Sequence, residues 1–228
     1  MIILILVVLL IVGPSIWVWY AMKRHGRERR DLPGTGGELA IHLINRFKLE
    51  GVNVEQTQER GDHYSPDEKM VRLSPSIYQG RSLTAVAVAA HEVGHAIQFI
   101  RDEKLARASS RYKPLADRAD RISSILFWLI GAISVISHIP HLFIICLVIA
   151  LLTFIVAVVL NFLDLPLEWD ASFGKALPIL ITGDYVQAED IPAIKSVLRA
   201  AAFTYLARSM LNIVNLGRWL ALLLRVLR

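Results

Sequence analysis

Residues 85–99 have the sequence AVAVAAHEVGHAIQF, an apolar run that contains His91, Glu92 and His95. Such a run is compatible with a membrane span, a buried core helix or a metal-binding helix. About eight mostly apolar residues precede His91, whereas a helix needs roughly 20 to cross a bilayer. We therefore expect a core helix that begins near Ser82 and ends at about Ile100, where the polar sequence RDEK follows.

The polar residues of this helix match the pattern H-E-x-x-H. Histidines at positions i and i+4 lie on one face of a helix, so that both imidazoles of His91 and His95 can reach one metal ion. Glu92 lies beside them and is expected to act as the general base on water. Gly94 leaves room for another backbone. Buried polar groups without partners are costly, and a metal would satisfy all three, so the sequence predicts one zinc ion per chain.

A catalytic zinc site needs a third protein ligand and an open position for water. Glu168, in the segment LPLEWDAS (165–172), is the first candidate, and His63 in GDHY competes with it. The further candidates are four aspartates that more often serve as solvated or capping residues: Asp62, Asp67, Asp170 and Asp184.

The composition predicts a membrane protein, because 54% of the 228 residues are hydrophobic. Residues 1–21 are expected to form an N-terminal anchor, because Met1–Tyr20 is uncharged and ends in aromatic residues. No charged residue lies between Arg121 and Asp164, a stretch about twice the length of one span. With a turn at Ser137–His141, residues 122–163 are predicted to form a transmembrane hairpin.

Basic residues flank the predicted spans. The segment KRHGRERR (23–30) follows the first one, and seven Lys or Arg residues between Arg101 and Arg121 precede the second. By the positive-inside rule the segment between them is cytoplasmic, in a multi-pass protein of the plasma membrane. The net charge of +5 is explained by this topology, so that nucleic-acid binding is not expected.

Residues 164–228 are predicted to contain the third ligand and a C-terminal helix. Arg208 and Arg218 interrupt the apolar pattern of this helix, which either lies along the bilayer or crosses it. The expected number of transmembrane helices is accordingly three to four.

Residues 32–120 are predicted to form a small α+β lobe. The sequence indicates an amphipathic helix at Glu38–Gly51, a strand at Val52–Gln56, a turn-rich segment at 61–69 and a second strand at Met70–Ser74. The second strand is a candidate edge for pairing with an extended substrate. The predicted fold class is a mainly α integral membrane protein with a small α+β lobe on the cytoplasmic side.

The sequence DHYSPDEKMVRLSPSIYQGRSLTAVAVAAHEVGHAIQ, followed by a membrane hairpin and LPLEWDAS, resembles the YugP-type neutral zinc metallopeptidases of bacterial membranes. The order of these features is also similar to that of the HtpX-like and CAAX prenyl proteases. The resemblance implies a zincin-like lobe of the gluzincin type. It implies that His91, His95 and Glu168 hold the zinc and that Glu92 is the base.

One position departs from the HtpX-like pattern, which has an aspartate four residues after the ligand glutamate. Here that position is Ser172. An aspartate would orient a ligand histidine. Ser172, or Asp170 from another angle, is expected to take that role.

The hypothesis is therefore a membrane-anchored zinc endopeptidase that acts on a protein or peptide substrate associated with the lipid bilayer. His63, Tyr64 and Tyr205 are candidates for contacting the substrate or stabilising the oxyanion. Two alternatives remain. One is intramembrane cleavage, which needs the motif inside a true span. The other is a non-enzymatic scaffold with a closed structural zinc site, in which a fourth protein ligand such as His63 takes the place of water.

Overall fold

The computed structural model describes residues 2–136, 148–149, 152, 155–156, 159–160, 162–204 and 207. The chain divides into two compact units. Unit 1 consists of Met1–Gly13, Ala108–Asp164 and Tyr205–Arg228, and unit 2 of Pro14–Arg107 and Leu165–Thr204. The predicted turn at 137–141, Tyr205 and the C-terminal helix beyond residue 207 lie outside the described residues.

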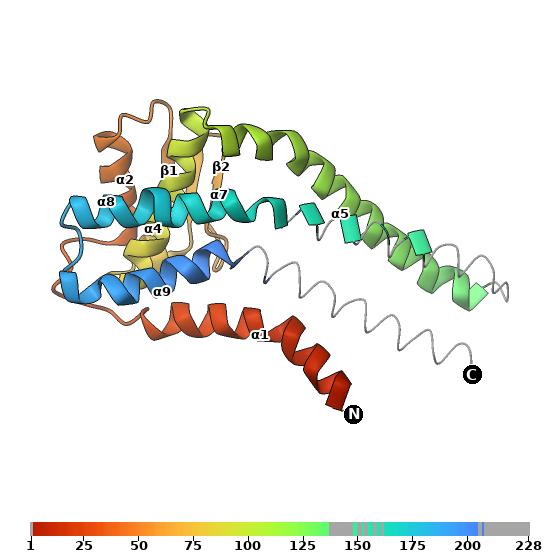
Figure 1. Ribbon diagram of the computed structural model, residues 1–228. Helices are drawn as coiled ribbons and strands as arrows, with labels where there is room; N and C mark the ends of the chain where they lie inside the picture. Colours follow the sequence, from red (N-terminus) through yellow and green to blue (C-terminus); the bar gives the residue numbers. More distant parts are fainter. Residues whose placement is uncertain are drawn as a thin grey trace. The chain divides into compact units, whose positions relative to one another are not determined.

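Most of the described chain is helical, with one small sheet (Figure 1). The elements are α1 (Ile2–Arg24), α2 (Gly36–Arg46), β1 (Asn53–Gln56), β2 (His63–Ser65), β3 (Met70–Leu73), α3 (Pro75–Tyr78), α4 (Leu83–Ile100), α5 (Lys104–Ile136), α7 (Leu165–Trp169), the π-helix η1 (Asp170–Ala176), α8 (Leu177–Thr182), the 3₁₀ helix η2 (Ala188–Asp190) and α9 (Ile191–Ala202). The α+β character predicted for the lobe is confirmed.

Helix α4 is the centre of unit 2, and it contacts α2, α3, β2, β3, η1, α8 and α9. Every residue from Leu83 to Gln98 is buried. The helix begins where the sequence predicts, because the Ser82 side chain accepts a hydrogen bond from the Ala85 amide at 3.1 Å and caps the first turn. A helix that is apolar on all sides must be enclosed, and here protein encloses it.

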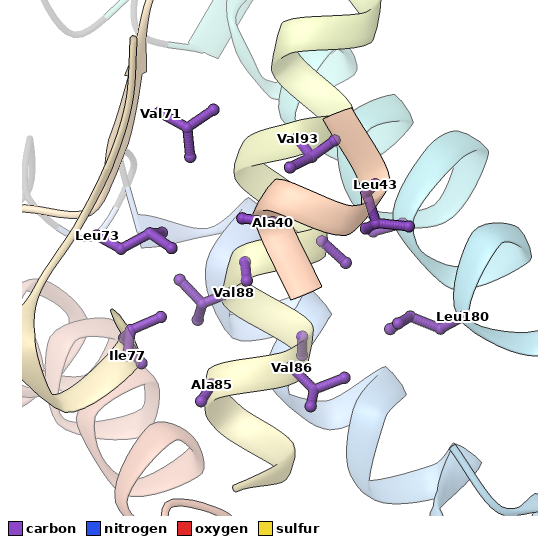
Figure 2. Close-up of a cluster of buried hydrophobic side chains, with 14 of the residues drawn as sticks. Ala40, Leu43, Val71, Leu73, Ile77, Ala85, Val86, Val88, Val93 and Leu180 are labelled. Atoms are coloured by element: carbon purple, nitrogen blue, oxygen red, sulfur yellow. The ribbon is translucent and has the colours of Figure 1, made fainter. Parts of the chain in front are cut away.

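The core of unit 2 forms between α4 and the elements around it (Figure 2). Strand β3 alternates half-buried and buried residues, so that Val71 and Leu73 point into the core. They face Val88 and Val93 of α4, while Leu43 of α2 covers another side of the helix. These contacts hold α4 rigidly between the sheet and the helices.

The sheet has the strand order β1-β3-β2. Strand β1 pairs with β3 in parallel, and β2 pairs with it in antiparallel, with Tyr64 opposite Val71. Strand β3 is therefore central, and the prediction that Met70–Ser74 offers a free edge is wrong. The reason is that the segment predicted as turn-rich contains a strand of three residues, His63–Ser65, which covers that edge.

Helix α2 is shorter than the predicted Glu38–Gly51. It starts earlier because Thr35 and Glu38 form a reciprocal capping box, with the Glu38 amide 3.2 Å from the Thr35 hydroxyl and the Thr35 amide 2.8 Å from the Glu38 carboxylate. It ends at Arg46, after which Lys48 adopts a left-handed backbone conformation with φ of 52°.

The predicted three to four transmembrane helices are not supported. Among the described residues, one helix is long and apolar enough to cross a bilayer, and this helix is α4, which is buried inside unit 2. Helix α5 is charged over its first half, and most of the remainder of the predicted hairpin lies outside the described residues. Within unit 1, Ser109 and Tyr112 of α5 each donate a hydrogen bond of 2.8 Å to Asp164.

The close approach of η1 to α4 depends on Gly94. A Cβ atom at this position would lie 2.7 Å from the carbonyl oxygen of Ala171, which is too short for a van der Waals contact. Gly94 therefore has the packing role that the sequence predicted.

Replacing Gly94 by Ala is expected to lower the free energy of unfolding by about 2 kcal/mol, because a backbone carbonyl must move to admit the methyl group. Thermal unfolding in detergent, followed by circular dichroism, measures this change. Gly13→Ala is the matched control, because the structure places nothing within 4 Å of its Cβ position. A Gly94→Ala variant as stable as this control would contradict the packing argument.

Candidate metal centre

Three potential metal ligands converge beside α4. The Nε2 atoms of His91 and His95 are 3.2 Å apart, and the Glu168 Oε2 atom lies 3.3 Å from the first and 3.2 Å from the second. All three residues are buried, with exposed fractions of 3%, 7% and 4%. The structure thus brings together the two motif histidines and the glutamate that lies 73 positions after His95.

The spacing of these atoms fits a zinc ion. Nitrogen and oxygen ligands lie at about 2.0–2.2 Å from zinc, and two ligands of a tetrahedron with that radius are about 3.3–3.6 Å apart. The observed separations of 3.2–3.3 Å lie at the short end of this range. Two imidazoles and a carboxylate are also the donor types that zinc prefers.

Glu168 reaches the histidines because the segment that carries it packs directly on α4. It lies in the short helix α7, which continues into the π-helix η1. The widened π turn is uncommon and is often found at functional sites. Gly94 allows the Ala171 carbonyl to approach α4, one turn after Glu168.

The Nδ1 atom of His91 is 2.9 Å from the Ser172 hydroxyl. That hydroxyl donates its single proton to the Leu198 carbonyl at 3.0 Å, so it accepts from the Nδ1–H of His91. Nε2 is then the nitrogen that faces Glu168. Ser172, one of the two residues expected to orient a ligand histidine, therefore contacts His91.

His95 has a different partner, Gln98, which was not among the residues predicted from the sequence. Its Nδ1 atom lies 3.0 Å from Gln98 Oε1, and Gln98 is fully buried. A signal was available, because Gln98 is polar within the apolar run and lies three residues after His95, on the same face of the helix. Asp170, the other residue expected to orient a histidine, contacts Gln98 instead.

Glu168 and His95 strongly affect each other's pKa. Burial raises the pKa of the Glu168 carboxyl, but the two histidines outweigh this effect and hold the pKa well below its usual range. Burial lowers the pKa of His95, but the Glu168 carboxylate dominates and raises it to about 9.

Glu92 is buried next to the three converging residues, with an exposed fraction of 7%. Burial raises its pKa above the ordinary value, and the charges of His91 and His95 offset part of this rise. A carboxylate with a raised pKa is a better proton acceptor near neutral pH than an exposed one.

Among the described residues, the other candidates predicted from the sequence do not belong to this group of three ligands. Within the described part of the chain, the cluster of potential ligands comprises His91, His95 and Glu168 and does not include His63. The His63 ring donates to the Gly61 carbonyl at 2.6 Å. Tyr64 is buried against Phe99 of α4, and its hydroxyl has no hydrogen-bond partner among the described residues.

The aspartates considered as ligands have other surroundings. Asp62 accepts hydrogen bonds from the amide and hydroxyl of Ser74, at 2.7 and 2.9 Å. Asp67 and Asp184 are exposed. Tyr205 lies outside the described residues.

Comparisons with known proteins agree with this geometry. A family model described as "Putative neutral zinc metallopeptidase" matches residues 1–224. The "Putative membrane protease YugP" of Bacillus subtilis (strain 168) is 30% identical over 224 residues, which cover 93% of this chain and 92% of the relative. No solved structure gives a significant match. The chain that places two histidines and a glutamate at zinc-ligand spacing therefore belongs to this family of neutral zinc metallopeptidases.

Proposed function

We propose that this protein is a membrane-anchored zinc endopeptidase of the gluzincin type, with its active site on the cytoplasmic side at the membrane surface. His91, His95 and Glu168 hold one zinc ion, and Glu92 is the general base. The observation that carries this proposal is the buried group of three ligand atoms separated by 3.2–3.3 Å.

The residues around the site would divide the chemistry of peptide hydrolysis between them. A zinc ion held there supplies Lewis-acid activation of water and of the scissile carbonyl. Glu92 accepts the proton of the attacking water and delivers it to the leaving amine. The buried surroundings exclude competing solvent and strengthen the electrostatic interactions on which this transfer depends.

The number of ligands favours catalysis over a structural site. A closed structural site needs four protein ligands, and the described group has three. The His63 ring, which the scaffold alternative would use as the fourth, is engaged with the Gly61 carbonyl. The intramembrane alternative needs the motif within a span, whereas protein surrounds α4 in unit 2.

Strand β2 is the best place for an extended substrate to pair. It lies at the edge of the sheet and contacts α4, the helix that carries the motif. Main-chain hydrogen bonds to such an edge hold a peptide independently of its sequence. Tyr64, on this strand, has a buried hydroxyl without a hydrogen-bond partner among the described residues.

Exposed apolar side chains support membrane attachment. In unit 2, Trp17, Trp19 and Tyr20 of α1 and Trp169 of α7 are each at least 40% exposed. Phe203 links two of them, with its ring centroid 6.2 Å from Trp17 and 6.4 Å from Trp169. Tryptophan and tyrosine favour the membrane interface.

Unit 1 exposes large aliphatic and aromatic residues along two segments. These residues are Leu115, Ile122, Ile125, Leu129, Val148, Ile149, Leu152, Ile155, Val156, Val159, Phe162 and Leu163. Surfaces of this kind are rare in soluble proteins and common where lipid is the solvent. By the positive-inside rule, the Lys and Arg residues at 23–30 and 101–121 support a cytoplasmic location for the intervening segment.

Glu92→Gln is expected to retain zinc and to lose peptidase activity by at least about 100-fold, because the amide cannot accept a proton. The protein is purified in detergent, its zinc content is measured by mass spectrometry, and degradation of an unfolded membrane protein is followed. Glu50→Gln, at an exposed glutamate after α2, is the matched control and is expected to retain full activity.

Two results would contradict this assignment. Unchanged cleavage by Glu92→Gln would exclude Glu92 as the base. Full zinc content in Glu168→Ala would exclude Glu168 as a ligand, because removing one of three protein ligands is expected to weaken binding severely.

Trp169 is expected to lie at the depth of the lipid headgroups. A variant that keeps Trp169 as its single tryptophan, with Phe at the other four positions, is reconstituted into vesicles that contain brominated lipids. Strong quenching of its fluorescence is expected. An emission spectrum typical of indole in water, without quenching, would contradict interfacial placement of this residue.

A further inference from the structure

Gln98 lies at the end of the motif helix and connects α4 to the segment that carries Glu168. Its side chain is completely buried and makes three hydrogen bonds. Oε1 lies 3.0 Å from His95 Nδ1, and Nε2 lies 3.0 Å from the Leu167 carbonyl oxygen and 2.8 Å from Asp170 Oδ2. The Gln98 amide therefore contacts a proposed metal ligand, His95, and two residues of the segment that carries Glu168.

The surroundings of Gln98 fix the orientation of its amide. The Leu167 carbonyl and the Asp170 carboxylate are both acceptors, so the amino group with its two protons must face them. The carbonyl oxygen Oε1 must then face His95. Because Oε1 can only accept, Nδ1 of His95 must carry a proton, and Nε2 is left as the nitrogen directed at His91 and Glu168.

Asp170 is also held by an ion pair to the same carboxylate oxygen that Gln98 contacts. Lys175 Nζ lies 3.1 Å from Asp170 Oδ2 and 3.0 Å from Glu103 Oε2, so that one ammonium joins η1 to the segment after α4. Gly174 adds to the fit, because a Cβ atom there would overlap the Asp170 carboxylate at 2.1 Å. The aspartate therefore keeps one orientation toward the amide.

We propose that Gln98 is the positioning residue of His95, and that Asp170 acts on the metal centre through it by fixing the direction of its amide. Gln98 holds the ring plane of His95 and keeps the proton on Nδ1. Ser172 holds the ring of His91 in the same way, so each ligand histidine is oriented by its own hydrogen-bond partner. This inference rests on the proposed zinc site.

A charge-swapped pair tests the proposal. Gln98→Leu removes all three hydrogen bonds at nearly constant volume and is expected to weaken zinc binding 10–100-fold. Gln98→Glu alone places a carboxylate 2.8 Å from Asp170 and is also expected to weaken it. In Gln98→Glu with Asp170→Asn, the asparagine donates to the new carboxylate, which accepts from His95. The donation to the Leu167 carbonyl is not restored, so zinc affinity should exceed that of Gln98→Glu alone but stay below that of wild type.

The measurements are zinc affinity by competition with a chromophoric chelator, and the visible absorption spectrum of the cobalt-loaded protein. The spectrum reports ligand geometry, which a change in stability alone does not alter. Thermal unfolding of the metal-free variants is recorded alongside. Gln79→Leu, at an exposed glutamine that contacts Gln56 at 2.9 Å, is the control and should change neither metal readout.

Each possible outcome either supports or overturns the proposal. Weaker zinc binding with an altered cobalt spectrum in Gln98→Leu, and recovery in the swapped pair, support the proposal. Affinity within twofold of wild type with an unchanged spectrum would overturn it, as would a swapped pair no better than Gln98→Glu. If Gln98→Leu does not fold, the swapped pair decides. A wild-type protein that binds neither metal would overturn the proposed function itself.

Discussion

Three ligand atoms must meet within about 3.3 Å inside an apolar core, and the rest of unit 2 is arranged around this requirement. Two of the atoms are fixed on a single helix by the spacing of His91 and His95. The third must come from elsewhere in the chain, so a second backbone has to lie against that helix. Gly94 makes this approach feasible, because the Ala171 carbonyl occupies the space of a side chain. The three ligands can therefore meet only if η1 packs closely on α4.

The burial of the site explains why its polar groups are so completely connected. An unpaired histidine or carboxylate in this core would destabilise the fold. The Nδ1 atoms of the two histidines are engaged by Ser172 and Gln98, while their Nε2 atoms face Glu168. The Glu168 carboxylate raises the pKa of His95, against the effect of burial, to about 9.

The features that could be predicted from the sequence are those with a strong local sequence pattern. The motif helix has a capping serine, an apolar run and a fixed histidine spacing, and its bounds came out as expected. Glu168 was identifiable as a candidate because the predicted hairpin at 122–163 returns the chain to the side of the motif helix just before it. Strand β2 was missed because three residues give too short a pattern, and that omission made β3 look like an edge.

Other features depend on tertiary contacts that no single segment encodes. The role of Gln98 follows from the positions of Leu167 and Asp170, which lie about 70 residues away in the chain. The substitution of Ser172 for the aspartate of the HtpX-like pattern left the orientation of the histidines open. The structure gives each histidine its own partner. The prediction of three to four membrane spans rested on hydropathy alone. The described helices do not support that number.

X-ray absorption spectroscopy at the zinc K-edge of the loaded protein tests the ligand set most directly. The proposed site should give two imidazoles and two oxygen ligands at about 2.0–2.1 Å, one oxygen from Glu168 and the other from solvent. A third imidazole, or a sulfur at about 2.3 Å, would show a different ligand set and would contradict the central claim that His91, His95 and Glu168 form an open catalytic site.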